Sequence, residues 1–169
     1  KLNSVTAGGA ASTYSNVIGK TLQGASVTTS AVNFTTLSTA VYAPDAGVSQ
    51  YNVWSGSATV STRAVLLKAA TFKFVGSAPV DSLQNLSLYV DGARVSGPTT
   101  VNAANNNKVT FDLGSTPLNL TTGAHTFDVR GDIVKGSFRT ITMSVENVAD
   151  LMFEDSSLTG VNIGTTVET

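Results

Sequence analysis

Apolar residues recur at every second position, and this alternation constrains the fold of the chain more than any other feature. Between positions 108 and 113, Val109, Phe111 and Leu113 alternate with charged or hydroxyl residues. The same pattern recurs in four other stretches, at 66–74, 86–90, 126–130 and 140–145. Because successive side chains of a strand point to opposite faces, each stretch predicts a half-buried antiparallel strand. No stretch has comparable helical periodicity, so the chain is predicted to be all-β.

The dipeptide Asp91-Gly92 lies between two apolar runs and predicts a β-hairpin. Both central residues of a type I′ turn need positive φ, which Asp and Gly tolerate. A two-residue turn there pairs Val90 with Ala93, Tyr89 with Arg94, and Leu88 with Val95. Further turn signals stand at 97–98, 105–107, 114–117, 122–123 and 131–132. Strands at this spacing indicate a sandwich or barrel.

Composition excludes several classes of function. The chain of 169 residues carries a net charge of -1, and only 12% of its residues are charged, about half the usual share in soluble domains. Clustered Lys and Arg for nucleic acid are therefore absent from the sequence, and no apolar run is long enough for a membrane span. The sequence contains no cysteine, so disulfides and thiolate metal sites are impossible. A hydroxyl-rich, cysteine-free composition favours an exported or cell-surface protein. Because the chain begins at Lys1, we expect it to be processed or part of something longer.

The stretch 64–163 resembles the Ig-like β-sandwich modules of bacterial surface-layer and fibrous cell-surface proteins. Four segments carry the resemblance, namely LLKAATFKFVG (66–76), LSLYVDG (86–92), LTTGAHTFDVRGDI (120–133) and ITMSVENV (141–148). The resemblance implies an Ig-like antiparallel β-sandwich of about seven to nine strands with extended terminal segments. It also implies a structural or adhesive surface role, and it transfers no functional residue. We expect an extended arm at 1–23, the sandwich at 24–157 and an extended C-terminal segment at 158–169.

Few residues point to catalysis. The only histidine, His125, shares the parity of Phe127 and Val129, which favours a place at the rim of the core. No second His, no Cys and no G-x-S-x-G motif accompanies it. We therefore predict no catalytic, cofactor-binding or metal-ligating residue, no cofactor and no enzymatic activity.

Several other motifs have both a chemical and a structural interpretation, and the structural one is preferred in each case. Carboxylates that offer oxygen ligands for calcium are Asp150, Glu154 and Asp155, or Asp128 with Asp132. Lys73 lies between Phe72 and Phe74, where a lysine of a surface sandwich can form an isopeptide bond, but the alternation directs it to solvent. Arg130-Gly131-Asp132 spells an integrin-type tripeptide and also suits a turn. Sequons begin at Asn33, Asn85 and Asn119.

The preferred hypothesis for function is a structural subunit of a surface assembly, either a filament, a pilus-like fibre or a surface layer. Copies of the chain, or neighbouring modules, would associate by β-strand addition through a terminal segment. The side chains expected to set the register are Val27, Val32, Phe34, Val161 and Ile163. An alternative is a carbohydrate-binding or adhesive module that exposes Tyr51, Trp54 or Tyr89, although Trp54 fits the core equally well. A viral or phage shell protein is the third hypothesis.

Overall fold

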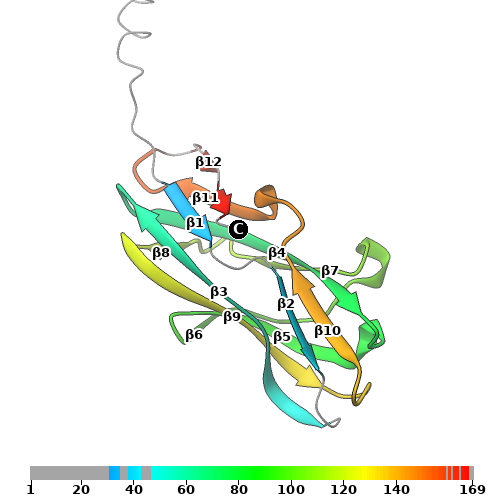
Figure 1. Ribbon diagram of the computed structural model, residues 1–169. Coiled ribbons are helices and arrows are strands. Elements are labelled where there is room, and N and C mark those ends of the chain that lie inside the picture. The colour runs from blue at the N-terminus through cyan, green and yellow to red at the C-terminus, as the bar shows by residue number, and fades with distance from the viewer. Residues whose placement is uncertain are drawn as a thin grey trace, which may run out of the picture.

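The computed structural model describes residues 31–34, 38–42, 47–158, 160, 162–163 and 165–167, which form two packed β-sheets (Figure 1). In chain order the strands are β1 (Ala31–Phe34), β2 (Ser38–Tyr42), β3 (Val48–Ser61), β4 (Val65–Gly76), β5 (Leu83–Val90), β6 (Ala93–Thr99), β7 (Lys108–Asp112), β8 (Leu118–Leu120), β9 (Gly123–Ile133), β10 (Thr140–Ser144), β11 (Leu151–Asp155), β12 (Asn162–Ile163) and β13 (Thr165–Val167). Three 3-10 turns connect them, η1 (Val80–Ser82), η2 (Ala103–Asn105) and η3 (Val148–Asp150). Nine strands in this part of the chain have five or more residues, which confirms the predicted sandwich of seven to nine strands.

The first sheet, sheet A, has six strands in the order β13-β1-β3-β9-β5-β6. Its pairs are antiparallel except for β1 and β13, which run parallel. The long strands β3 and β9 form its centre, and the hairpin of β5 and β6 continues the sheet to one edge. The predicted N-terminal arm, 1–23, lies outside the described residues.

The second sheet, sheet B, is organised around β4, whose length lets it pair with two strands on each side. Ala70 of β4 pairs with Leu151 of β11 and also with Phe111 of β7, so these two strands lie on opposite sides of β4. By the same reasoning β10 lies on the side of β11, and β8 lies on the side of β7. Beyond β10 and β11 the sheet continues into β2 and β12.

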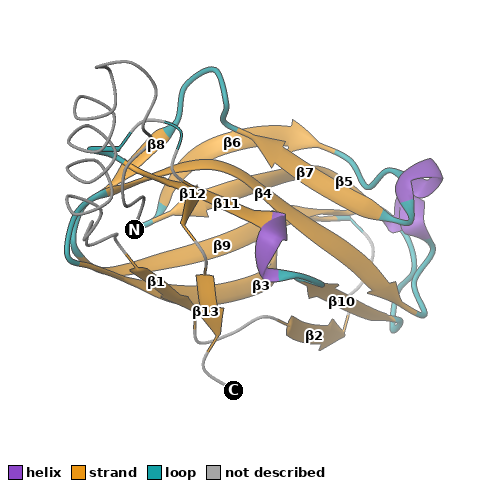
Figure 2. Ribbon diagram, turned by 90° about the horizontal axis from the view of Figure 1, so that it is seen from above, coloured by secondary structure: helices purple, strands orange, loops and turns teal. Residues whose placement is uncertain are grey.

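The sandwich therefore has two long sides of different construction (Figure 2). Strands β1 and β13 of sheet A and β2 and β12 of sheet B lie on one side, which we call the terminal side. Strand β6 of sheet A and strands β7 and β8 of sheet B lie on the other, which we call the notch side. The terminal side is built by segments from both ends of the described chain, including parts of the expected C-terminal segment.

Aromatic rings connect the two sheets through the core. Trp54 of β3 packs edge-on against Phe72 of β4, with ring centroids 4.8 Å apart. Phe72 in turn packs edge-on against Phe111 of β7, with centroids 6.0 Å apart. All three side chains are about 1% exposed. The inward parity predicted for Phe72 and Phe111 is confirmed, and together with Trp54 these rings join the two sheets in one core.

The Asp91-Gly92 turn is confirmed, with φ of 50° and 80° at its two central residues. Val90 pairs with Ala93 and Tyr89 with Arg94, as predicted, but Leu88 pairs with Ser96 instead of Val95. A β-bulge at this point places two residues of β6 opposite one of β5 and shifts the register.

Two of the turn predictions are wrong. The Gly97-Pro98 pair lies within β6, and Gly131-Asp132 lies within β9, the strand between β3 and β5. At Gly131 an added Cβ would lie 2.7 Å from Leu86 Cδ2 and 3.1 Å from the Gln84 carbonyl oxygen, so this glycine is at a point of close packing within the sheet. Within the described residues there is no helix with the length and hydropathy of a membrane span.

Candidate functional site

The terminal residues expected to contact a neighbour are partly used inside the chain itself. Val32 is fully buried in β1, which pairs with β3 of the same chain. Ile163 is buried in β12, which pairs with β11. Phe34 ends β1 opposite Ala58, and only its backbone pairing is described. Val27 and Val161 lie outside the described residues. The sheets end in β13, β12 and β2 on the terminal side and in β6, β7 and β8 on the notch side. Of these edge strands, β6, β7 and β8 have all their side chains described.

Trp54 is a core residue and not an exposed contact. Its side chain is 1% exposed and packs against Phe72, so the interpretation of Trp54 as a binding aromatic is corrected. A β-bulge in β3 between Asn52 and Trp54 changes the parity of the strand there. Because the bulge depends on the partner strand β9, the short pattern around Trp54 did not decide its direction.

The two tyrosines expected to be exposed are both half-buried. Tyr51 packs against the core from its edge. Tyr89 lies on the outer face of sheet A, where its hydroxyl donates to Gln50 Oε1 at 2.7 Å. The guanidinium carbon of Arg130 lies 4.5 Å from the centre of the Tyr89 ring, a cation–π distance. The ring is therefore covered on one face by the chain's own arginine.

Phe138 is an exposed aromatic that the sequence analysis did not identify. It lies in the loop between β9 and β10, its side chain is 78% exposed, and its φ is +60°. A bulky residue in the left-handed region is a strained conformation, and such strain is often found at contact sites. Phe138 lies outside the alternating stretches, so the sequence pattern did not predict that its side chain is exposed.

His125 is held on both ring nitrogens at the edge of the core, as its parity predicted. Nδ1 lies 2.7 Å from Asp91 Oδ2, and Nε2 lies 2.8 Å from the carbonyl oxygen of Thr121. A carboxylate and a carbonyl oxygen are both acceptors, so this arrangement favours the doubly protonated ring, in which each nitrogen donates. Burial lowers the pKa of His125, but the bonds to Asp91 and Thr121 outweigh burial and raise it above its ordinary value. The same bond lowers the pKa of Asp91.

The carboxylates considered for calcium are engaged with the chain's own cations and donors. Asp150 lies 3.6 Å from Lys108 Nζ, and Glu154 pairs with Lys68. Asp155 is 1% exposed and accepts a hydrogen bond from Arg63 at 2.7 Å. The Lys68 bond, with a further bond from the Gly160 N–H, lowers the pKa of Glu154. Among the described residues no group of three or more His, Asp or Glu is placed to hold a metal.

Asp128 and Asp132 lie on the outer face of β9, in two separate sets of hydrogen bonds. Asp128 accepts from Arg130, Ser55 and Asn52, and these bonds outweigh the effect of burial and lower its pKa. Asp132 accepts from Asn85 Nδ2 at 2.7 Å and from the Gln50 N–H at 2.9 Å, which lowers its pKa. The Arg130-Gly131-Asp132 tripeptide is thus part of a strand inside sheet A, and both of its charged side chains form hydrogen bonds within the chain. It differs in this from a motif displayed on a loop.

Lys73 points away from Phe72 and Phe74, as the alternation predicted, and ends 2.5 Å from Glu146 Oε1. This bond and that of Lys108 lower the pKa of Glu146. Of the sequons, Asn119 is exposed in β8, whereas the Asn85 side chain is bonded to Asp132. Asn33 lies in β1, and its side chain is outside the description.

The outer edge of β7 offers unpaired backbone groups. Phe74 N–H donates to the Asn107 carbonyl at 2.9 Å, and Leu113 N–H donates to the Lys68 carbonyl at 2.7 Å. Because bonding direction alternates along an antiparallel strand, the residues that face β4 are 107, 109, 111 and 113. The N–H and C=O groups of Thr110 and Asp112 then face outward, where no strand of the described chain pairs with them. Lys108 also faces outward, but its carbonyl accepts from Asn102 N–H at 2.8 Å.

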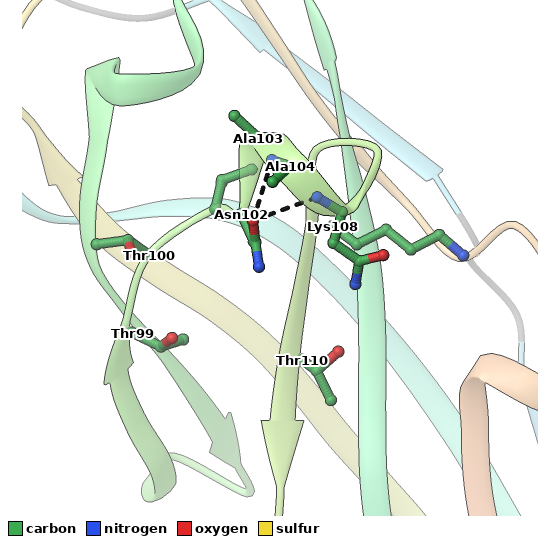
Figure 3. Close-up of a pocket in the computed structure, with 9 residues that line it drawn as sticks. Thr99, Thr100, Asn102, Ala103, Ala104, Lys108 and Thr110 are labelled. Carbon is green, nitrogen blue, oxygen red and sulfur yellow. Dashed lines mark hydrogen bonds between the residues drawn. The ribbon is translucent and has the colours of Figure 1, made fainter.

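Beside this edge is a hollow of about 630 Å³ between β6 and β7, which we call the notch (Figure 3). Thr99 of β6 and Thr110 of β7 face it from opposite sides, and η2 closes its top. Asn102 Oδ1 caps η2 by accepting from the N–H groups of Ala104 and Asn105. The Lys108 side chain runs away from the notch and lies 3.2 Å from Glu146. The lining is therefore hydroxyl, amide and small apolar groups with little charge.

The chain was compared with known proteins. No protein-family model matches it, and no curated protein matches it.

Proposed function

We propose that this chain is a non-enzymatic structural subunit of an extracellular or cell-surface assembly, and that copies associate by β-strand addition. The observation that carries the proposal is the outer edge of β7, where Thr110 and Asp112 direct backbone donors and acceptors toward solvent. An unpaired strand edge is a template for another extended segment.

The notch side carries some of the devices that usually protect an edge, but none of them lies at Thr110 in the middle of β7. Natural edges carry inward charges or prolines, or are covered by a loop or helix. On β7, Lys108 is held by Glu146 and Asp150 at one end of the strand. Thr110, in the middle, bonds only to Thr71 of the neighbouring strand through its hydroxyl. On β6, in contrast, Pro98 has no N–H and interrupts the ladder, which makes β7 the better acceptor.

The test is the association state of the full chain as a function of concentration, with electron microscopy of the products. Thr110→Pro removes the outward N–H and should shift assembly to higher concentration by about tenfold or more, since a partner carbonyl is left unpaired. Thr110→Val keeps the N–H and removes only the hydroxyl, so it should assemble like the unaltered chain. Equal assembly by all three proteins, or none by any, contradicts the proposal.

A carbohydrate-binding or adhesive module is a second candidate, and the exposure of Phe138 favours it. Aromatic rings are enriched at interfaces because they bury a large area with few rotatable bonds. A glycan array probed with the chain and with Phe138→Ser tests this candidate. Binding that the substitution removes supports it, and an array without binding counts against it.

A further inference from the structure

We infer that the notch between β6 and β7 receives residues 21–30 of a second copy of this chain, which add as a strand to the outer edge of β7. The inference rests on the proposed function and names the two surfaces that it requires.

The edge that would accept the added strand is defined by which backbone groups of β7 face away from β4. Four backbone groups face outward, the N–H and C=O of Thr110 and of Asp112. The next outward carbonyl, that of Lys108, is already bonded to Asn102 N–H. An added strand can therefore form its ladder with Thr110 and Asp112, and the residues that pair with Thr110 lie nearest η2. This places part of the added strand in the notch between Thr99 and Thr110 (Figure 3).

The lining of the notch selects an uncharged segment. Its only ionisable side chain is Lys108, which is directed away and paired with Glu146 at 3.2 Å and Asp150 at 3.6 Å. The lining hydroxyls belong to Thr99, Thr100 and Thr110. A charged segment would lose water without meeting a counter-charge here, whereas a segment of Ser, Thr and small apolar residues would not.

The chain contains such a segment in front of its first described strand. No residue between Lys20 and Asp45 is charged. Within this stretch β1 is already paired with β3 on the terminal side, so residues 21–30 are the part that precedes the paired strand. Val27 stands among Ser26, Thr28 and Thr29, a composition that suits an extended strand.

Cysteine pairing tests the contact directly, because the chain has no cysteine of its own. We expect Val27→Cys mixed with Thr99→Cys to form a disulfide-linked heterodimer under mild oxidation. The matched control is Ser49→Cys, an exposed serine on β3 near the terminal side, which should give only background. Crosslinking no greater than the control overturns the inference. A disulfide within one molecule of the double variant at high dilution overturns the assignment to a second copy.

A labelled peptide of residues 21–30 tests the strand geometry without altering the acceptor. Two versions carry N-methyl groups on alternate residues, so that each blocks the donors of one edge. Bound to the full chain below its assembly concentration, one version should bind about tenfold more weakly or worse, and the other should bind like the plain peptide. Thr110→Pro should weaken binding, and Thr110→Val should not. Equal binding of both methylated peptides overturns the inference.

These results separate the two proposals. Assembly that Thr110→Pro blocks, without crosslinking or peptide binding, overturns this inference and supports strand addition by another segment. Peptide binding by a chain that never assembles overturns the proposed function and supports the notch as a strand site.

Discussion

The two long sides of the sandwich both end in edge strands, but they are built from different parts of the chain. On the terminal side, β1 covers β3 in sheet A and β2 covers β10 in sheet B. On the notch side, no described strand covers β6 or β7, and the hollow between them is lined by threonines. The terminal side shows that short, uncharged segments of this chain can act as edge strands. The notch side offers an edge on which such a segment would fit.

The comparison also shows that a strand with an unpaired outer edge can still be firmly packed in the core. Phe111 anchors β7 in the core through Phe72, while the next residue back, Thr110, faces solvent. A firmly held strand with a bare edge is a better acceptor than a mobile one, because less conformational freedom is lost on binding.

The largest expected effect tests whether β7 is as firmly held as β3. Phe111→Ala and Trp54→Ala should each lower the free energy of unfolding by about 3–5 kcal/mol, since each removes a fully buried ring. Urea denaturation measures both values. If Phe111→Ala costs less than about 1 kcal/mol, β7 is not anchored and the comparison fails.

Replacing a small residue on each side should give a smaller and unequal effect. Val32→Ala should lower the free energy of unfolding by about 2 kcal/mol, because the Val32 side chain in β1 is fully buried. Thr110→Ala should cost less than about 1 kcal/mol, because it removes only one exposed hydroxyl bond, to Thr71. Equal losses at both positions would show that the two sides do not differ in the way described.

The His125 bond predicts a dependence on pH, at the end of the sandwich where the β5–β6 turn meets the β8–β9 connection. The folded state raises the pKa of His125, so its stabilisation is complete below the ordinary value of about 6.5. It is lost as the pH rises through the folded pKa. Urea denaturation at rising pH should therefore show a falling free energy of unfolding.

The matched control for this prediction is His125→Gln. His125 is the only histidine, so the slope in this range should largely disappear in the variant. A slope that persists unchanged would assign it to other groups.

Thr110→Pro should have an effect on stability as small as that of Thr110→Ala. Proline is tolerated at an edge position whose N–H faces solvent, so the loss should be less than about 1 kcal/mol. A loss of more than about 3 kcal/mol would show that this N–H has a partner within the folded chain.

Alternation in the sequence predicted the strands and the buried faces, because both follow from the local period of two. It predicted the inward positions of Phe72, Phe111 and His125, while the Asp91-Gly92 dipeptide predicted the turn. The alternation could not predict β-bulges, because a bulge depends on the pairing with the partner strand. The register shift between Leu88 and Tyr89 and the burial of Trp54 both lie at bulges.

Position within a sheet could not be read from the sequence either. Gly131-Asp132 has the composition of a turn, yet it lies in the strand between β3 and β5, where Asp132 bonds to Gln50 and Asn85. Conversely, Lys108–Asp112 alternates like any other strand, and only its pairing with β4 alone reveals a free edge. The candidate site was therefore not predictable, because an unpaired edge is a property of topology.

Amide hydrogen exchange along β7 is the most direct measurement of the central claim. In the monomer, the amides of Val109 and Phe111 should be protected and those of Thr110 and Asp112 should exchange rapidly. On assembly, Thr110 and Asp112 should become protected while Val109 and Phe111 change little. Protection of Thr110 and Asp112 in the monomer, or rapid exchange of both in the assembled state, would contradict the account.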